Sequence, residues 1–256
     1  MLRILNADLR ELLKNKLFYL YAAGAFVYPL VLLGVYKIVI HFLNDGSAVY
    51  VDDILTAYPT LSIFLVTVMI IALLVPGFKD GTLRNKMMAG VTRSEIVISM
   101  MLTATVATVI LAGCGFLSTF GIGCLLTKGF SELTLGSALL YYLLTVLSEI
   151  AIGVFVVALI TVFGGSNLAL VVPLVVAFIC KVITAIVEDK LFPEQGECVL
   201  KGARLTVYTL YSKYSAYAHL MGPTRWGAFE ISMGALFLTT VSFIVAIAVF
   251  NKRDLA

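Results

Sequence analysis

Six long apolar stretches separated by polar segments dominate the hydrophobic pattern of this chain. Each is continuous rather than alternating, and each has at least the roughly 20 residues that a helix needs to cross a bilayer. Backbone groups in lipid must pair within the protein, so such runs predict helices rather than the alternating strands of a barrel. We therefore expect an all-α membrane protein, built as one transmembrane domain of six helices. The spans are expected over residues 17–40, 55–75, 96–126, 139–162, 168–187 and 231–250.

The composition supports this interpretation. Of the 256 residues, 61% are hydrophobic and only 13% are charged, whereas soluble domains are about half apolar and about a quarter charged. The third apolar stretch is longer than one span requires, and glycines recur in its second half. We expect a tilt, a kink or a frayed outer end there.

Lysine and arginine are concentrated in some polar segments and missing from others. Residues 1–16 carry four of them and residues 78–95 carry four more, whereas residues 41–54 carry none and include three aspartates. Basic residues in short loops mark the cytoplasmic side. We therefore expect a multi-pass protein of the plasma membrane, with both termini and residues 78–95 in the cytoplasm and a long outer loop at 188–230.

Residues 1–16 are expected to form an amphipathic helix. Leu5, Leu9, Leu12 and Leu13 fall on one helical face, while most of the charged residues fall elsewhere. Such a helix lies along the inner leaflet, with its basic residues near anionic lipid.

The outer loop contains a repeat of tyrosines. Tyr208, Tyr211, Tyr214 and Tyr217 recur every three residues, which on a helix makes one aromatic stripe. The stripe indicates either an interfacial or re-entrant helix or a packing face against the spans. Cys198 is the cysteine that lies in a polar loop, and it is expected to be a free thiol or to pair between chains.

The polar segment 78–95 has its own helix signals. Gly81 and Gly90 bracket a predicted two-turn helix over Thr82–Ala89, with Asp80 expected to cap its start and Gly90 to end it. A capping box is expected just after it, from Thr92 to Glu95. A short helix between two spans favours contact with a cytoplasmic partner, and the alternative is a basic loop that only fixes topology.

Two ionisable residues fall inside apolar spans. Glu149 and Lys181 are each sixteen positions from Gly165, at the centre of the hairpin that joins spans four and five. Equal depth predicts that they pair, or that Lys181 extends outward while Glu149 faces the bundle interior. They indicate a translocation path or a proton-coupled site, and the alternative is a structural ion pair.

No enzyme signature is found in the sequence. There is no phosphate-binding G-x-x-x-x-G-K-[ST] loop, no Cys/His cluster with metal-ligand spacing and no basic patch interleaved with aromatic residues. We expect a protein that is not an enzyme by itself, holds no metal and binds no nucleic acid.

The whole chain resembles a known family, through two motifs together with the six expected spans, the amphipathic N-terminal helix and the long last outer loop. The residues Asp80-Gly81-Thr82-Leu83-Arg84-Asn85, followed by Gly90-Val91-Thr92-Arg93, resemble the segment after the second span of type-2 ATP-binding cassette (ABC) transporter permeases. The ending, residues 250–255, resembles the usual close of that family.

The resemblance implies a half-transporter, in which two permease chains, identical or different, assemble with two ATPase subunits. ATP and Mg would bind the ATPase subunits and not this chain. Residues 82–89 would be the coupling helix that docks on the ATPase. The coupling residues implied are Asp80, Gly81, Thr82, Leu83, Arg84, Asn85, Lys86, Met87, Gly90, Arg93 and Glu95. Members of this size often export peptides, including antimicrobial ones, lipids, polysaccharides or drugs.

Two other functions stay open. A proton-coupled secondary transporter would use Glu149 and would be expected to show repeated groups of spans, which are not evident between the two halves. A non-transporting membrane anchor would recruit a cytoplasmic partner through residues 78–95.

Overall fold

The computed structural model describes residues 2–43, 48–131, 133–193, 200–222 and 226–252. Throughout these residues the fold is helical, and six helices are long and apolar enough to cross a membrane, which confirms the predicted class. Those six are α2 (Lys16–Leu43), α4 (Ala57–Lys79), α6 (Arg93–Phe116), α8 (Leu135–Phe163), α9 (Leu168–Leu191) and α11 (Ala228–Lys252). The shorter elements are α1 (Leu2–Lys14), α3 (Asp52–Leu55), α5 (Thr82–Met88), η1 (Leu117–Gly123), α7 (Cys124–Leu126), α10 (Ala203–Tyr214) and η2 (Ala218–Leu220).

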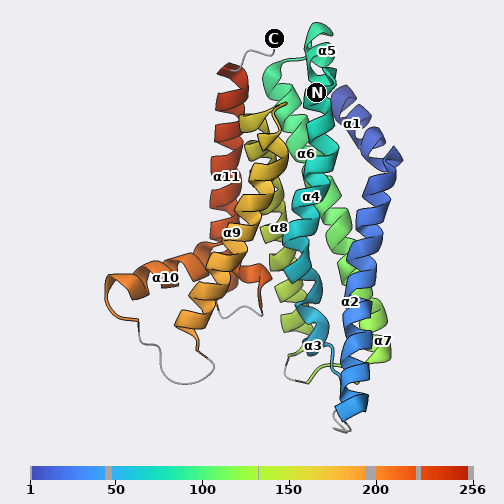
Figure 1. Ribbon diagram of the computed structural model, residues 1–256, viewed down its shortest axis with the longest axis vertical. Helices are drawn as coiled ribbons and strands as arrows, with labels where there is room; N and C mark the ends of the chain where they lie inside the picture. The colour runs from blue at the N-terminus through green and yellow to red at the C-terminus, as the bar shows by residue number, and fades with distance from the viewer. Residues whose placement is uncertain (1, 44–47, 132, 194–199, 223–225, 253–256) are drawn as a thin grey trace.

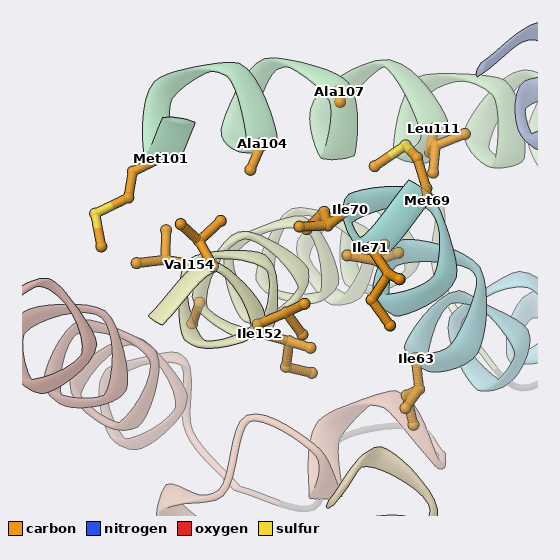
Figure 2. Packing of buried hydrophobic residues seen from close by; sticks show 14 of the residues in the cluster. Ile63, Met69, Ile70, Ile71, Met101, Ala104, Ala107, Leu111, Ile152 and Val154 are labelled. Atoms are coloured by element: carbon orange, nitrogen blue, oxygen red, sulfur yellow. The ribbon is translucent and has the colours of Figure 1, made fainter. Parts of the chain in front are cut away.

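Helix α8 lies at the centre of the bundle. It packs against α4, α6, α9 and α11, and apolar residues are spread around most of its circumference, as expected for a helix that packs on several sides. Figure 2 shows α6 passing over α8 with Ala104 turned toward Val154 of α8. Ala107 of α6 and Ile70 of α4 are buried in the same cluster. Small residues on α6 let the two backbones approach closely.

The ends of the bundle differ. Helices α1 and α5 and the end of α11 lie at one end, which we call the α5 end, and α3 and α7 lie at the other (Figure 1). Helix α10 leans out from the bundle between α9 and α11 near the α3 end. The positively charged residues predicted to be cytoplasmic therefore gather at the α5 end.

The long third span is not a single regular helix. Helix α6 gives way to π-helical turns in η1, followed by the short α7. The glycines of the second half predicted a tilt, a kink or a frayed outer end, and the structure shows a change of helical winding there instead. Gly115 has a specific reason to be glycine, because a Cβ there would collide with the ring of Tyr58 on α4.

The tyrosine repeat between α9 and α11 does not form one stripe. Helix α10 ends at Tyr214, and the chain turns to extended backbone at Ser215, so Tyr217 lies outside the helix. Tyr217 is buried and Tyr214 is exposed, so the two side chains face different surroundings. The predicted stripe is therefore wrong at its last member. Cys198 lies outside the described residues, as do the family-like residues 253–255.

Candidate functional site

The start of α5 is built differently from the prediction. Gly81 is the N-cap residue, in the left-handed region with φ 70°, and no side chain caps the helix. Asp80 instead closes α4, since its backbone N–H donates to the carbonyl of Pro76. The expected Asp80 cap is therefore wrong: Asp80 and Gly81 are the two residues between the helices, and Asp80 closes the first of them. Helix α5 thus follows α4 with almost no linker.

The far end of α5 and the start of α6 are fixed by local hydrogen bonds. Gly90 has φ 87°, and its N–H donates to the carbonyl of Met87 at 2.9 Å, a glycine C-terminus of the common kind. The Thr92 hydroxyl accepts from the N–H of Glu95, and the Glu95 carboxylate accepts from the N–H of Thr92 at 3.1 Å. The predicted capping box is confirmed. Helix α5 is therefore held at both ends by short, defined turns.

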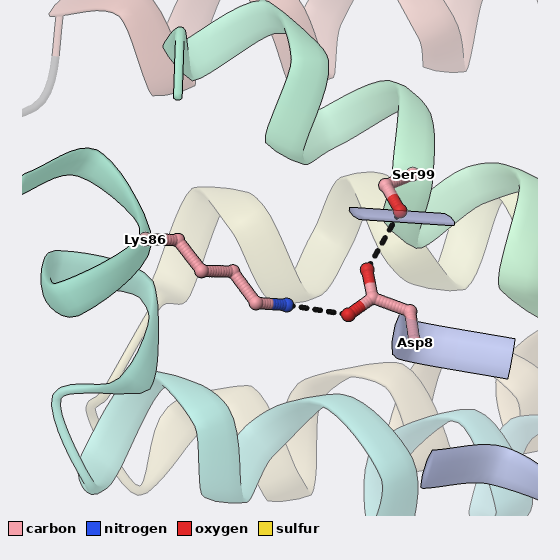
Figure 3. Close-up of polar contacts among 3 residues, drawn as sticks. All are labelled: Asp8, Lys86 and Ser99. Atoms are coloured by element: carbon pink, nitrogen blue, oxygen red, sulfur yellow. Dashed lines mark hydrogen bonds and ion pairs between the residues drawn. The ribbon is translucent and has the colours of Figure 1, made fainter. Parts of the chain in front are cut away.

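One face of α5 is anchored to the bundle. Leu83 is buried in the core, and the Lys86 ammonium donates to Asp8 of α1 at 2.5 Å. The other oxygen of Asp8 accepts from the Ser99 hydroxyl of α6 at 2.6 Å (Figure 3). Asp8 thus joins α1, α5 and α6, which we call the Asp8 bridge. The Lys86 and Asp8 side chains are only 23% and 12% exposed, so water competes weakly for this bridge.

The opposite face of α5 is open. Arg84, Asn85 and Met88 are exposed, Met88 at 72%. Met87, which the family resemblance placed among the coupling residues, packs against the core instead. Met88 was missed in the sequence, although its spacing of four from Arg84 would have placed it on the same helical face. The exposed surface combines a cation, an amide and a large apolar side chain.

Arg93 forms hydrogen bonds within the chain, to the end of α11. Its guanidinium donates to the carbonyl of Asn251 at 2.8 Å and to that of Phe250 at 3.5 Å. These carbonyls belong to the last turn of α11, which lacks helical partners for them. Arg93 therefore joins the start of α6 to the end of α11.

A second polar cluster lies inside the bundle around Glu149. This side chain is 1% exposed, and the Tyr58 hydroxyl donates to its Oε2 at 3.1 Å. Lys181 is elsewhere, with its ammonium 5.0 Å from the centroid of the Phe64 ring on α4. The predicted ion pair between Glu149 and Lys181 is therefore wrong. The alternative, in which Glu149 faces the bundle interior, describes the structure.

Tyr58 is held tightly beside Glu149. Its ring lies against Gly115 and stacks on Tyr142 with 6.1 Å between centroids. Several buried hydroxyls around these helices have no hydrogen-bond partner within the described residues. They belong to Thr108, Ser118, Thr119, Tyr142, Thr145 and Ser148.

The segment between α9 and α11 packs on the bundle through a third set of contacts. Tyr211 donates to the carbonyl of Cys180 at 3.3 Å and shares a hydrogen bond with Thr184, while Tyr208 is half-buried. These contacts favour the packing interpretation of the tyrosines. Burial lowers the pKa of His219 to about 4, although a hydrogen bond to the backbone of Lys213 opposes part of the shift.

No group of three or more His, Cys, Asp or Glu side chains that could hold a metal ion occurs in the part of the chain that the structure describes.

Comparison with known proteins adds no identification. A scan with protein-family models and a search of curated proteins found no match to this chain.

Proposed function

We propose that this chain is the permease subunit of an ATP-driven exporter and that a separate ATPase docks on the exposed face of α5. The observation that carries the proposal is the division of α5 into two faces. Leu83 and Lys86 fix it to the bundle, while Arg84, Asn85 and Met88 are left open at the α5 end. Arginine and methionine are enriched in protein interfaces. A helix that only connected two spans would need no such surface.

The connections of α5 suit the transmission of force. Only Gly81 separates α5 from Asp80, the residue that closes α4, and the Asp8 bridge ties it to α1 and α6. A push on α5 would move the ends of these helices together, because short turns and buried contacts transmit displacement with little loss. Two such chains, moved by two ATPase subunits, would open alternately to each side of the membrane. The resemblance to type-2 ABC permeases favours a peptide, lipid or drug as the exported substrate.

The test is association with an ATPase and its dependence on α5. The tagged chain would be purified from its own membranes with bound proteins, reconstituted into liposomes and assayed for vanadate-sensitive ATP hydrolysis. Arg84→Glu and Met88→Glu should each reduce ATPase association about tenfold or more, the effect of losing roughly 1.4 kcal/mol at an interface.

The matched control is Arg204→Glu, the same charge reversal on exposed α10 near the opposite end of the bundle. It should leave association unchanged. ATPase association that survives both α5 variants would contradict docking on this face. Association without substrate movement in liposomes would favour a membrane anchor instead of an exporter.

A further inference from the structure

Glu149 is a buried acid with few polar contacts. Its Oε2 accepts from Tyr58, but its Oε1 has no hydrogen-bond partner within the described residues. An ionised carboxylate at 1% exposure would need a nearby cation or several donors to offset its lost hydration. The Ser62 hydroxyl also lies beside Glu149, but it donates to the carbonyl of Pro59 at 2.8 Å. Two neutral hydroxyls, of which one donates elsewhere, supply neither a cation nor several donors, so the arrangement fits a neutral carboxylic acid.

The titratable groups that face Glu149 are phenols. They are Tyr58 from α4 and Tyr141 and Tyr142 from α8 itself, and Cys114 of α6 lies beside Tyr58. None of these carries a positive charge in any protonation state. They can therefore share hydrogen bonds with Glu149 but cannot neutralise its anion.

The other elements packed against α8 bring no cation to it either. On α9, Lys181 lies over Phe64. Within the described part of α11 the ionisable residues are Glu230 and Lys252, near its two ends. The imidazole of His219, on η2, hydrogen-bonds to the backbone of Lys213.

Buried hydroxyl groups without a hydrogen-bond partner among the described residues occur on two elements. Ser148 and Thr145 precede Glu149 on α8, and Ser118 and Thr119 lie on the π-helical turns of η1, with Thr119 against Tyr142 of α8. Buried polar groups without protein partners commonly bind internal water. A line of hydroxyls and water is a route along which a proton can leave a buried acid.

The contact between Tyr58 and Glu149 depends on η1. The Tyr58 ring rests on Gly115, two residues before the π-helical turns begin at Leu117. Single π-helical turns inside helices are frequent at functional sites. A change in the winding of these turns would alter the surface that supports the Tyr58 ring, which carries the hydrogen bond to Glu149.

We propose that Glu149 is a proton-binding site of the bundle. The acid is neutral while Tyr58 donates to it. When η1 rearranges, the carboxyl O–H bond breaks, the proton passes to water and Glu149 becomes the anion; rebinding reverses the step. If the proposed exporter is correct, this adds a proton exchange to its cycle, but the neutral acid does not depend on that function.

Infrared spectroscopy of the purified chain in lipid nanodiscs tests the proposal without any ATPase. A glutamic acid in water is ionised at about pH 8, whereas Glu149 should still show the carbonyl stretch of a protonated carboxyl. Glu149→Gln should remove that band, and Tyr58→Phe should shift it, because the acid loses its hydrogen bond. The control Glu230→Gln, at the start of α11, should leave it in place.

Three results would overturn the proposal. They are the absence of a Glu149-dependent band from the folded wild-type chain at about pH 8, an unshifted band in Tyr58→Phe, and loss of the band when sodium replaces choline. The last result would indicate a sodium site. A normal band together with no ATPase association would refute the exporter and leave the proton site standing.

Discussion

Removing the charge of Asp8 should loosen α1 from the α5 end. Asp8 accepts from Lys86 at 2.5 Å and from Ser99 at 2.6 Å. A fully exposed ion pair contributes at most about 1 kcal/mol, and a hydrogen bond to a charged group about 1.5–3 kcal/mol. The bridge is mostly buried, so Asp8→Asn, which keeps the shape and one acceptor, should cost about 1–2 kcal/mol.

This cost should appear as local opening of α1 rather than as global unfolding. A cavity of about 70 Å³ lies between α1 and the α4–α5 junction beside the bridge, so packing there is incomplete. A loss of 1–2 kcal/mol raises the population of an opened state about 5–30-fold. Hydrogen exchange of the purified chain in nanodiscs should show the α1 amides exchanging faster by that factor in Asp8→Asn and in Lys86→Met.

The double variant distinguishes a direct bridge from two independent effects. Asp8→Asn combined with Lys86→Met should cost less than the sum of the two, with a coupling energy of about 1 kcal/mol. Glu11→Gln is the control, because Glu11 is an exposed acid on the same helix. Additive single effects, or equally fast exchange in Glu11→Gln, would refute the bridge as the attachment of α1.

Three further outcomes are expected. Gly115→Ala should destabilise the bundle by about 1–3 kcal/mol, because the added Cβ collides with Tyr58. Gly113→Ala is its control and should be nearly neutral, because a Cβ there meets nothing within 4 Å. The free energy of unfolding of each variant in mixed micelles is the measurement. Thr92→Ala should lose the capping box and cost about 1 kcal/mol, seen as faster exchange at the start of α6. Because burial holds the pKa of His219 near 4, below its ordinary 6.5, its contribution to stability is complete above about pH 6.5 and is lost as the pH falls from about 6.5 to about 4. Thermal unfolding of His219→Gln should lack this loss, and an identical pH profile in both proteins would contradict the assignment.

The spans were predictable because the lipid sets their length and hydropathy locally. The fifth span, expected over 168–187, is α9, Leu168–Leu191. The second was expected to stop at residue 75, but α4 continues through Pro76 to Lys79. Proline is tolerated in membrane helices when neighbouring groups satisfy the freed backbone carbonyl, so the position of a proline alone does not end a span.

The failed pairing of Glu149 with Lys181 has a geometric reason. Counting from the hairpin predicts the depth of a residue but not its rotation about the helix axis. Both residues can be equally deep, yet Tyr58 approaches Glu149 and Phe64 approaches Lys181, each from α4. Such partners come from a third helix, and no local sequence pattern identifies them.

Helices α4 and α6 connect the polar cluster around Glu149 with the Asp8 bridge. Helix α4 carries Tyr58 near one end and leads into α5 at the other, while α6 carries Ser99 near the α5 end and Gly115 beneath the Tyr58 ring. A displacement of α5 relative to α6 would therefore reach the contact between the Tyr58 ring and Gly115, which lies beside the hydrogen bond from Tyr58 to Glu149. Because packed helices transmit displacement and η1 can change its winding, the irregular turns are where such a movement would be absorbed.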